Sequence, residues 1–286
     1  MSPLPAASAG SPDISFLVAS YNAAAFLEQA VRSALAQRGV RVEVLIVDDG
    51  STDESRRIAQ DLAAEDPRVR CLRTPVNLGP AGARNIAVDA ARGTWLAVLD
   101  SDDRIDPYRS CRLIEAAEQA KADMIADDLL VFDGSAGEAA RRFLDPARAA
   151  APGWIGLERY FAETRMFGRT PDLGFLKPMM RADFLRAHGI RYDESLRIAE
   201  DDALIVRLLL VGARYWLLPE PLYHYRKHAS SISHRLSVDH VDRMMAAGER
   251  LKEVVRASGR GAAALAPRHR ALRRAWAFTH LVEHLK

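Results

Sequence analysis

The chain has 286 residues, of which 49% are hydrophobic and 27% charged, as in an ordinary globular protein. Its 40 basic residues nearly balance 38 acidic ones, so the net charge of +2 does not indicate a nucleic-acid-binding protein. No apolar stretch reaches the roughly 18 to 20 residues of a membrane span. The two cysteines, Cys71 and Cys111, lack metal-ligand spacing and suit a reducing compartment. We therefore expect a cytoplasmic protein with at most a peripheral membrane contact.

Three regions are predicted along the chain. Residues 1–12 are rich in Pro, Ser and Ala, which predicts a disordered leader rather than a signal peptide. Residues 13–235 are predicted to form the main domain, with halves at 13–133 and 134–235. Residues 236–286 are predicted to form a C-terminal helical extension.

The first half of the main domain alternates between short apolar runs and helical patterns. Strands are predicted at Ile14–Ser20 and Val42–Asp49, and then at "VRCLRT", "TWLAVLD" and "DMIADDLLVF". Of the helices between them, one is predicted to open with a capping box of Ser51 and Glu54, and another to span Ala81–Ala91. Such βαβ units predict a Rossmann-like α/β fold with a mostly parallel central sheet flanked by helices.

After Gly134 the pattern becomes irregular, as expected of a segment that faces a substrate. A helix is predicted at about Ala203–Val211, followed by the extended stretch "YWLLPEPLYHYR". The C-terminal extension is predicted to be helices broken near Ser258–Gly261 and at Pro267. Beyond that proline, five Lys/Arg against one Glu accompany an apolar stripe. The tail thus fits a helix packed on the domain or on a second subunit, or a basic amphipathic helix on an anionic membrane.

Polar clusters follow three of the predicted strands, and the carboxyl ends of parallel strands meet at one crevice. These clusters are Tyr21–Asn22, Asp48–Asp49 and Asp100–Asp103. Aspartates at the end of a buried strand can accept hydrogen bonds from the base or ribose of a ligand. The first turn, "SYNAAAF", lacks the glycines of a dinucleotide-binding motif, so a dinucleotide site is not expected.

The strongest single motif is "LDSDD", in which an apolar strand runs into Asp100, Asp102 and Asp103. Carboxylates this close repel each other, which indicates a partner outside the sequence. Asp100 and Asp102 suit Mg²⁺ or Mn²⁺, which takes its other ligands from water and substrate phosphates. A solvated acidic turn would explain the charges but not their place after "WLAVL". Asp103 has no assigned role at this point.

Four weaker motifs each allow a structural and a functional interpretation. "NLGPAGARN" starts a helix with glycines and Arg84, which fits either capping or a phosphate site. "AEDDA" fits negative charge at a helix start or a general base near the metal. "LYHYRKHASSIS" fits a basic surface loop or contacts to phosphate and metal. For Asp127–Asp128 we expect a solvated loop or a helix start, with a pocket edge as the alternative.

Taken in order, "SYN", "VDDGSTDES", "NLGPAGARN", "LDSDD", "EDD" and "YRKHASSIS" resemble the motifs of family 2 glycosyltransferases of the GT-A fold. The resemblance covers roughly Ile14–Ser233. It implies an inverting hexosyltransferase that uses a UDP-sugar, such as UDP-glucose, with Mn²⁺ or Mg²⁺. A weaker likeness of Phe175–Asp202 to bacterial exopolysaccharide members implies a glycan or lipid-linked oligosaccharide acceptor.

The resemblance also implies roles for individual residues. Asp201 matches the catalytic base, which takes a proton from an acceptor hydroxyl, and Glu200 flanks it. Tyr21 would lie against the uracil ring. The implied nucleotide-sugar contacts are Ser20, Tyr21, Asn22, Asp48 or Asp49, Gly79, Arg84, Asp100, Ser101, Arg226 and His228. The implied metal ligands are Asp102, Asp100 and His228.

Two other functions remain open. A sugar-phosphate nucleotidyltransferase would share the α/β architecture, but it needs a Gly-rich basic loop after the first strand, which "SYNAAAF" does not provide. A catalytically silent nucleotide-sugar or glycan-binding subunit of a polysaccharide assembly complex would share the fold as well. The intact acidic motifs argue against this second alternative.

Overall fold

The computed structural model describes residues 10–133, 140–145, 151–164, 166, 172–228 and 236–285. Most of the predicted leader and part of the irregular middle region therefore lie outside the described residues. The strands are β1 (Ile14–Ser20), β2 (Val42–Asp48), β3 (Val69–Arg73), β4 (Trp95–Val98), β5 (Arg104–Ile105), β6 (Met124–Asp133), β7 (Arg141–Arg142), β8 (Gly153–Trp154), β9 (Met179–Arg181) and β10 (Tyr215–Lys227). The helices are α1 (Leu27–Leu35), α2 (Ser55–Glu65), α3 (Gly79–Ala90), α4 (Arg109–Ala120), α5 (Leu157–Glu163), α6 (Ala182–Ala187), α7 (Glu200–Leu210), α8 (Val238–Ser258) and α9 (Ala262–His284), with a 3₁₀ turn η1 at Leu173–Phe175.

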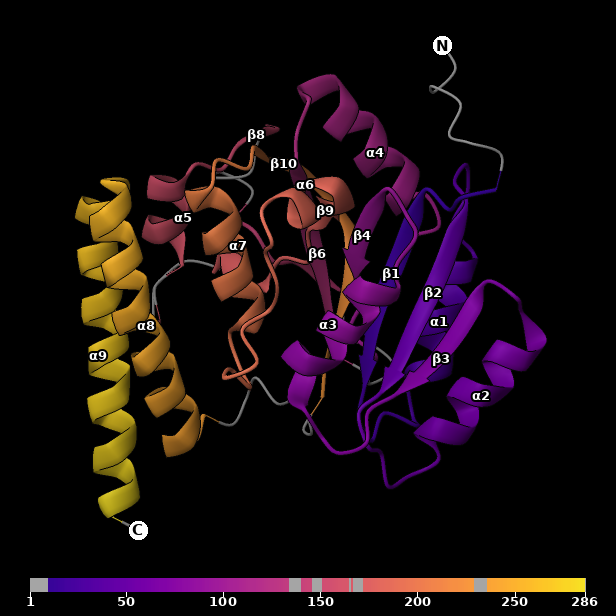
Figure 1. Ribbon diagram of the computed structural model, residues 1–286, viewed down its shortest axis with the longest axis horizontal. Coiled ribbons are helices and arrows are strands. Elements are labelled where there is room, and N and C mark those ends of the chain that lie inside the picture. The colour runs from indigo at the N-terminus through magenta and orange to yellow at the C-terminus, as the bar shows by residue number, and fades with distance from the viewer. Residues whose placement is uncertain are drawn as a thin grey trace.

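Within the described residues, the strands form one sheet in the order β3-β2-β1-β4-β9-β6-β10-β5, with β7 beside β6 and β8 beside β10 (Figure 1). Parallel pairing joins β3, β2, β1 and β4, and every residue of β2 is buried because helices cover both faces. The predicted α/β fold is confirmed, and β5, β7, β8 and β9 add antiparallel pairs to it. Strand β9 runs antiparallel between β4 and β6, so the sheet is mixed.

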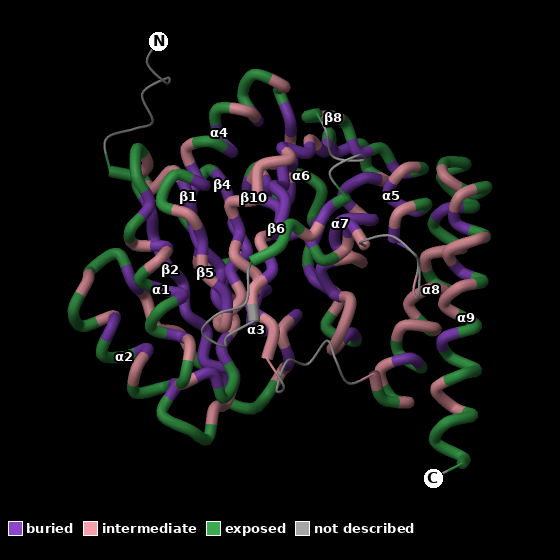
Figure 2. Tube along the Cα trace, turned by 180° about the vertical axis from the view of Figure 1, so that it is seen from behind, coloured by how far each residue is buried: buried purple, intermediate pink, exposed green. Residues whose placement is uncertain are grey.

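The sheet brings the ends of distant segments together. Strand β1 pairs with β2 so that Ser20 lies opposite Asp48, and the amide of Asp49 donates to the carbonyl of Ser20 at 2.8 Å. Strand β4 lies on the other side of β1 and leads within two residues to Asp100. Figure 2 shows these strands as the buried centre of the molecule, with the exposed residues on the surrounding helices and loops. The three predicted polar clusters therefore share one end of the sheet.

The start of α2 differs from its prediction. The helix begins at Ser55, and Glu54 makes no side-chain capping hydrogen bond, so the predicted capping box of Ser51 and Glu54 is wrong. The hydroxyl of Ser51 instead accepts from the amide of Asn22, and the carboxylate of Asp53 accepts from the amide of Ser55 at 2.9 Å. Ser51 serves the neighbouring turn because the sheet places that turn beside it, which sequence spacing does not show.

Helices α8 and α9 form a hairpin at one side of the sheet (Figure 1). The predicted break near Ser258–Gly261 is confirmed, since α8 ends and α9 begins there. The predicted break at Pro267 is wrong, because α9 continues through it. The proline lies in the second turn, where it removes one backbone donor. Packing of α9 against α8 and α5 offsets that loss, with Leu265 and Ala275 buried.

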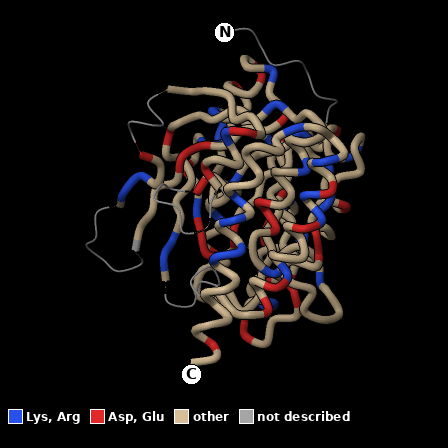
Figure 3. Tube along the Cα trace, turned by 90° about the vertical axis from the view of Figure 1, so that its left-hand side faces the viewer, with Lys and Arg blue, Asp and Glu red and all other residues tan. Residues whose placement is uncertain are grey.

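The exposed end of α9 leaves the predictions for the tail partly open. Helix α9 packs on α8 and α5, and Trp276 and His280 of its second half reach Asp242 of α8. Its last turns nevertheless expose Phe278, Leu281 and Leu285. No described helix combines the length and the apolar character that crossing a lipid bilayer requires. In the view of Figure 3, basic and acidic segments are interspersed.

Asp127 and Asp128 are buried inside β6, so the predicted solvated loop or helix start is wrong. Asp127 pairs with Arg109 of α4 at 2.8 Å, and both side chains are fully buried. Asp128 pairs with Arg142 of β7 at 2.9 Å and accepts from the amide of Leu144. These partners offset the cost of burying the carboxylates. A sequence pattern does not show them, because each arginine comes from another element.

We expect Arg109→Met to lower the free energy of unfolding by about 3 to 5 kcal/mol, because it would leave the Asp127 carboxylate buried without its cation. Urea unfolding at pH 7 measures the change. The matched control is Arg57→Ala, which breaks exposed ion pairs with Glu54 and Asp61 and should leave the midpoint nearly unchanged. Equal midpoints for the two variants would contradict the importance of the buried pair.

Candidate active site

A buried group of opposite charges lies where the carboxyl end of β4 meets α3 and the first turn of α7. Arg84 of α3 lies 2.7 Å from Asp100. The same guanidinium lies 2.5 Å from Glu200 and 3.1 Å from Asp201. Lys177 completes the group, with its Nζ 2.9 Å from Asp100 and 3.2 Å from Asp201. We call these five residues the charge cluster. Its two cations offset the repulsion of three carboxylates.

The small residues of α3 make room for Arg84 inside the protein. The helix packs against β1 and β2, and its first turns carry Gly79, Ala81, Gly82 and Ala83. Gly79 also has a φ of +82°, and a Cβ there would meet the Arg197 side chain at 2.6 Å. A larger residue at this position would therefore be strained. The guanidinium of Arg84 also lies 5.6 Å from the ring centroid of Tyr192.

The charge states in the cluster follow from competition between burial and pairing. Burial alone would raise the pKa of Asp100, but Lys177 and Arg84 outweigh it and lower that pKa to about 2. Burial likewise opposes the charge of Lys177, yet Asp100 and Asp201 raise its pKa well above the ordinary value. Burial raises the pKa of Glu200 despite the charge of Arg84. Asp100 and Lys177 are therefore charged throughout the neutral pH range.

The aspartate turn after β4 has the donors of a cation site. Asp100, Asp102 and Asp103 each bring a carboxylate oxygen within 4.8 Å of the others. Oδ2 of Asp102 lies 2.8 Å from Nε2 of His228, which directly follows β10. Carboxylate oxygens with an imidazole nitrogen fit Mn²⁺, and carboxylates with water fit Mg²⁺. Asp102 is the best-placed ligand, because both oxygens of Asp100 already contact the cations of the charge cluster.

Asp103 holds the aspartate turn against β10. It is buried and accepts hydrogen bonds from the hydroxyl of Tyr223 at 2.8 Å and from the amide of Arg226 at 2.7 Å. The guanidinium of Arg226 lies 4.8 Å from the ring centroid of Phe26 and 4.7 Å from that of Phe132. These contacts give Asp103 a structural role, and they orient Arg226 beside the turn.

The two aspartates at the end of β2 differ in how they are paired. Asp49 accepts from the hydroxyl of Thr74 and from the amides of Leu78 and Gly79, at 2.7 to 2.9 Å. Asp49 therefore occupies the backbone amides of Leu78 and Gly79 at the start of α3. Because these two amides are not free, the prediction that they bind a phosphate is wrong. Asp48 is 1% exposed, and within the described chain its Oδ2 has no hydrogen-bond partner. Asp48 thus keeps one buried oxygen that no described residue uses.

The turn after β1 provides further surface beside Asp48. Tyr21 is 48% exposed, so its ring is accessible, whereas Ser20 is buried and its hydroxyl has no partner among the described residues. Asn22 has a φ of +50°, and its side-chain oxygen accepts from the amide of Thr52 at 2.9 Å. Ser101 is half-buried and lies between Asp100 and Asp102 in the aspartate turn.

Two site residues were not identified from the sequence. Lys177 stands alone in the apolar stretch "GFLKPMM", and this isolation was the only available signal. Arg268 of α9 is the second: it pairs with Asp202 of α7 and donates to Thr164 at 3.2 Å. The hydroxyl of Tyr160 also donates to Asp202, at 3.0 Å. These contacts attach α9 to the helix that carries Glu200 and Asp201.

Known proteins share both the sequence and the fold. Residues 15–183 match the family model described as Glycosyl transferase family 2. The succinoglycan biosynthesis proteins ExoO and ExoU of Rhizobium meliloti (strain 1021) are 40% and 37% identical to this chain. ExoO aligns with 96% of this chain over 78% of its own length, and ExoU with 87% over 73%. S. aureus TarS 1-349 in complex with UDP-GlcNAc is 20% identical, with a TM-score of 0.67 over 84% of this chain and 66% of that one. At this identity, the likeness to TarS shows a shared fold.

Asp172 titrates at an accessible pH next to the site. Its carboxylate accepts from the amide of Gly174 at 2.7 Å, and burial together with the charge of Asp202 raises its pKa to about 6. The ordinary value is 3.8, so the folded protein binds more protons than the unfolded chain between about pH 4 and pH 6. The contribution of this carboxyl to stability is present below that window and is lost as the pH rises through it.

We therefore expect Asp172→Asn to match the parent protein at pH 4 and to unfold at a higher temperature than the parent at pH 7. Asn keeps an oxygen that can accept from Gly174. Thermal unfolding from pH 4 to pH 8 measures the difference, and Asp61→Asn at an exposed site serves as the control. Parallel curves for the parent and Asp172→Asn would contradict the prediction.

Proposed function

Since the chain belongs to glycosyl transferase family 2, we propose that it transfers a hexose from a UDP-sugar to a hydroxyl of a glycan or lipid-linked oligosaccharide. We propose that the reaction inverts the anomeric centre and uses Mn²⁺ or Mg²⁺. The relatives named for succinoglycan biosynthesis and the fold neighbour bound to UDP-GlcNAc support this choice of acceptor and donor. The charge cluster carries the proposal, because it holds Asp201 beside the aspartate turn.

The donor nucleotide fits the end of the sheet next to Asp48. The unpartnered Oδ2 of Asp48 can accept a hydrogen bond from an N–H of the uracil ring. Such a bond would remove the cost of leaving a buried oxygen unsatisfied. The exposed ring of Tyr21 offers a face for stacking on the base. Asp49 has its hydrogen bonds within the protein. We therefore assign base recognition to Asp48 and the positioning of α3 to Asp49.

Transfer requires a proton acceptor and a stabilised leaving group. Asp201 takes the proton of the acceptor hydroxyl, the hydroxyl oxygen forms a bond to the anomeric carbon, and the bond from that carbon to the UDP oxygen breaks. Both oxygens of Asp201 contact cations, Oδ1 that of Arg84 and Oδ2 that of Lys177. Lys177 therefore has to release Oδ2 before that oxygen can take the proton, and Lys177 then remains paired with Asp100. A divalent cation bound at Asp102 would supply positive charge for the departing diphosphate.

Asp201→Asn should lower the rate of sugar transfer by about 10²- to 10⁴-fold, because it removes the proton acceptor. The affinity for UDP should stay nearly unchanged, because Arg84 keeps Asp100 and Glu200 as partners and Lys177 keeps Asp100. Release of UDP from UDP-glucose, with and without an oligosaccharide acceptor, measures the rate. Calorimetry measures the affinity for UDP. Asp239→Asn, in the first turn of the exposed helix α8, is the matched control. An active Asp201→Asn enzyme would overturn the assignment, and a wild-type chain that binds UDP-glucose without turnover would indicate a silent subunit.

Asp102→Ala should remove most of the increase in UDP affinity that Mn²⁺ produces, by about tenfold or more, because the remaining donors of the turn are engaged elsewhere. Titration of UDP in the presence of Mn²⁺ and of EDTA provides the measurement. Asp61→Ala, far from the turn, should behave as the parent protein. An unchanged Mn²⁺ dependence in Asp102→Ala would refute its role as the main ligand.

The proposed function also assigns roles to the larger parts of the chain. We propose that residues 13–133 bind the donor, that residues 134–235 bind the acceptor, and that 236–286 form an extension. A lipid-linked acceptor would place the protein in the cytoplasm, in peripheral contact with the inner face of the cytoplasmic membrane. The exposed apolar end of α9 is a candidate for that contact, or for contact with a second copy.

A further inference from the structure

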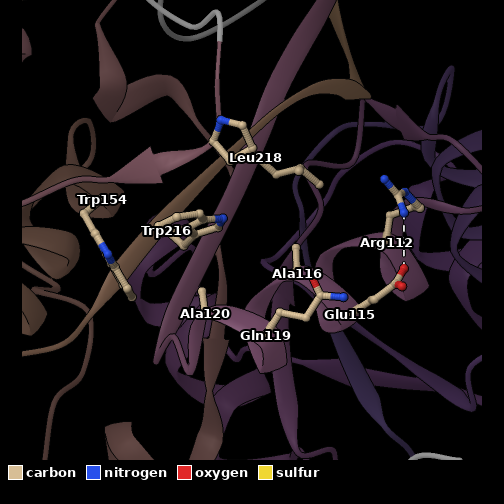
Figure 4. Close-up of a pocket in the computed structure, with 9 residues that line it drawn as sticks. Arg112, Glu115, Ala116, Gln119, Ala120, Trp154, Trp216 and Leu218 are labelled. Carbon is tan, nitrogen blue, oxygen red and sulfur yellow. Dashed lines mark hydrogen bonds and ion pairs between the residues drawn. The ribbon is translucent and has the colours of Figure 1, made fainter. Parts of the chain in front are cut away.

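A groove of about 430 Å³ lies between α4 and the first residues of β10, with β8 at its side (Figure 4). Its wall contains two tryptophans, Trp154 of β8 and Trp216 of β10, which are cross-strand neighbours. Their ring centroids lie 4.7 Å apart, with the ring planes at 75°. Trp154 is 47% exposed, so much of its indole faces solvent. The volume lies in the range of small-molecule sites, roughly 300 to 1,000 Å³.

The side of the groove opposite the tryptophans is polar and carries little net charge. Helix α4 presents Arg112, Glu115 and Gln119 along one face, with Ala116 and Ala120 beside them (Figure 4). Arg112 lies 3.2 Å from Glu115 and 2.6 Å from Glu220, so its charge is already matched. The exposed carboxylate and amide groups remain able to bind hydroxyl groups. The lining therefore favours an uncharged polyhydroxy ligand over a phosphate or another anion.

The groove is separate from the charge cluster. Trp216 lies near the beginning of β10, whereas Arg226 lies near its other end, beside the aspartate turn. None of the residues that line the groove belongs to the charge cluster or to the aspartate turn. A ligand in the groove therefore contacts none of the residues that are proposed to act on the reacting sugar. A long glycan chain that reaches both places is compatible with this separation.

We propose that this groove binds an uncharged pyranose segment of the glycan that the enzyme elongates. The inference rests on the proposed function for the identity of that glycan. The C–H faces of a pyranose ring pack on the exposed indole of Trp154, and its hydroxyl groups bind Glu115 and Gln119. Holding the chain at a second point raises its effective concentration at the active site without adding a contact there.

Calorimetric titration with cellotetraose and with maltotetraose tests the groove, because both are uncharged and their linkages differ. The experiment uses the full chain without any donor. We expect saturable binding of at least one tetrasaccharide, and a loss of about tenfold in affinity in Trp154→Ala. The matched control is Trp276→Ala on α9, which removes another partly exposed indole and should bind as the parent does. UDP should bind the parent and Trp154→Ala equally.

Other outcomes would overturn the proposal. Absence of tetrasaccharide binding to the parent, or equal binding by Trp154→Ala, would show that the groove is not a glycan site. A change from dimer to monomer in Trp154→Ala, measured by analytical ultracentrifugation, would show a contact between copies instead. Release of UDP from UDP-glucose tests the proposed function independently. Turnover without tetrasaccharide binding would refute the groove alone, and binding without turnover would refute the proposed function alone.

Discussion

Neutralisation of buried carboxylates by Arg84 and Lys177 is the interaction on which the site depends. Three acidic side chains from two distant segments cannot share an interior position without cations between them. Arg84 approaches from α3, and Lys177 from the segment before β9. That segment is itself held by Arg109, which donates to the carbonyl of Lys177 at 2.7 Å. The buried pair of β6 and the charge cluster are thus parts of one continuous arrangement.

The same constraint explains the division of work between neighbouring aspartates. In the acidic pairs at the end of β2 and after β4, one carboxylate is bound by the protein and the other is less fully engaged. Asp49 binds the start of α3 while Asp48 keeps an unsatisfied oxygen, and Asp103 binds β10 while Asp102 faces His228. The protein-bound member fixes the position of its neighbour. Preorganisation of this kind avoids reorienting charged groups during the reaction.

The fold was largely predictable from the sequence because hydrophobic periodicity and short connections report local structure directly. Strands such as β1 were predicted with the observed bounds, and strand-end motifs indicated where the site would form. What failed depends on contacts between distant segments. The pairing of Asp127 with Arg109 and the place of Lys177 arise only when the sheet is assembled. Pro267 was misjudged because packing on α5 outweighs one lost hydrogen bond.

The ion pair between Arg268 of α9 and Asp202 of α7 limits where the chain can be divided in a chimeric protein. The helical hairpin looks like an appendage that could be exchanged between related enzymes in a chimera. Its arginine, however, lies against Phe161 of α5 and reaches the residue next to Asp201. A fusion boundary placed before α8 would therefore divide one cooperative unit, and a grafted hairpin must bring an equivalent cation. A fusion boundary for protein engineering should therefore keep α5, α7 and the helical hairpin in one segment.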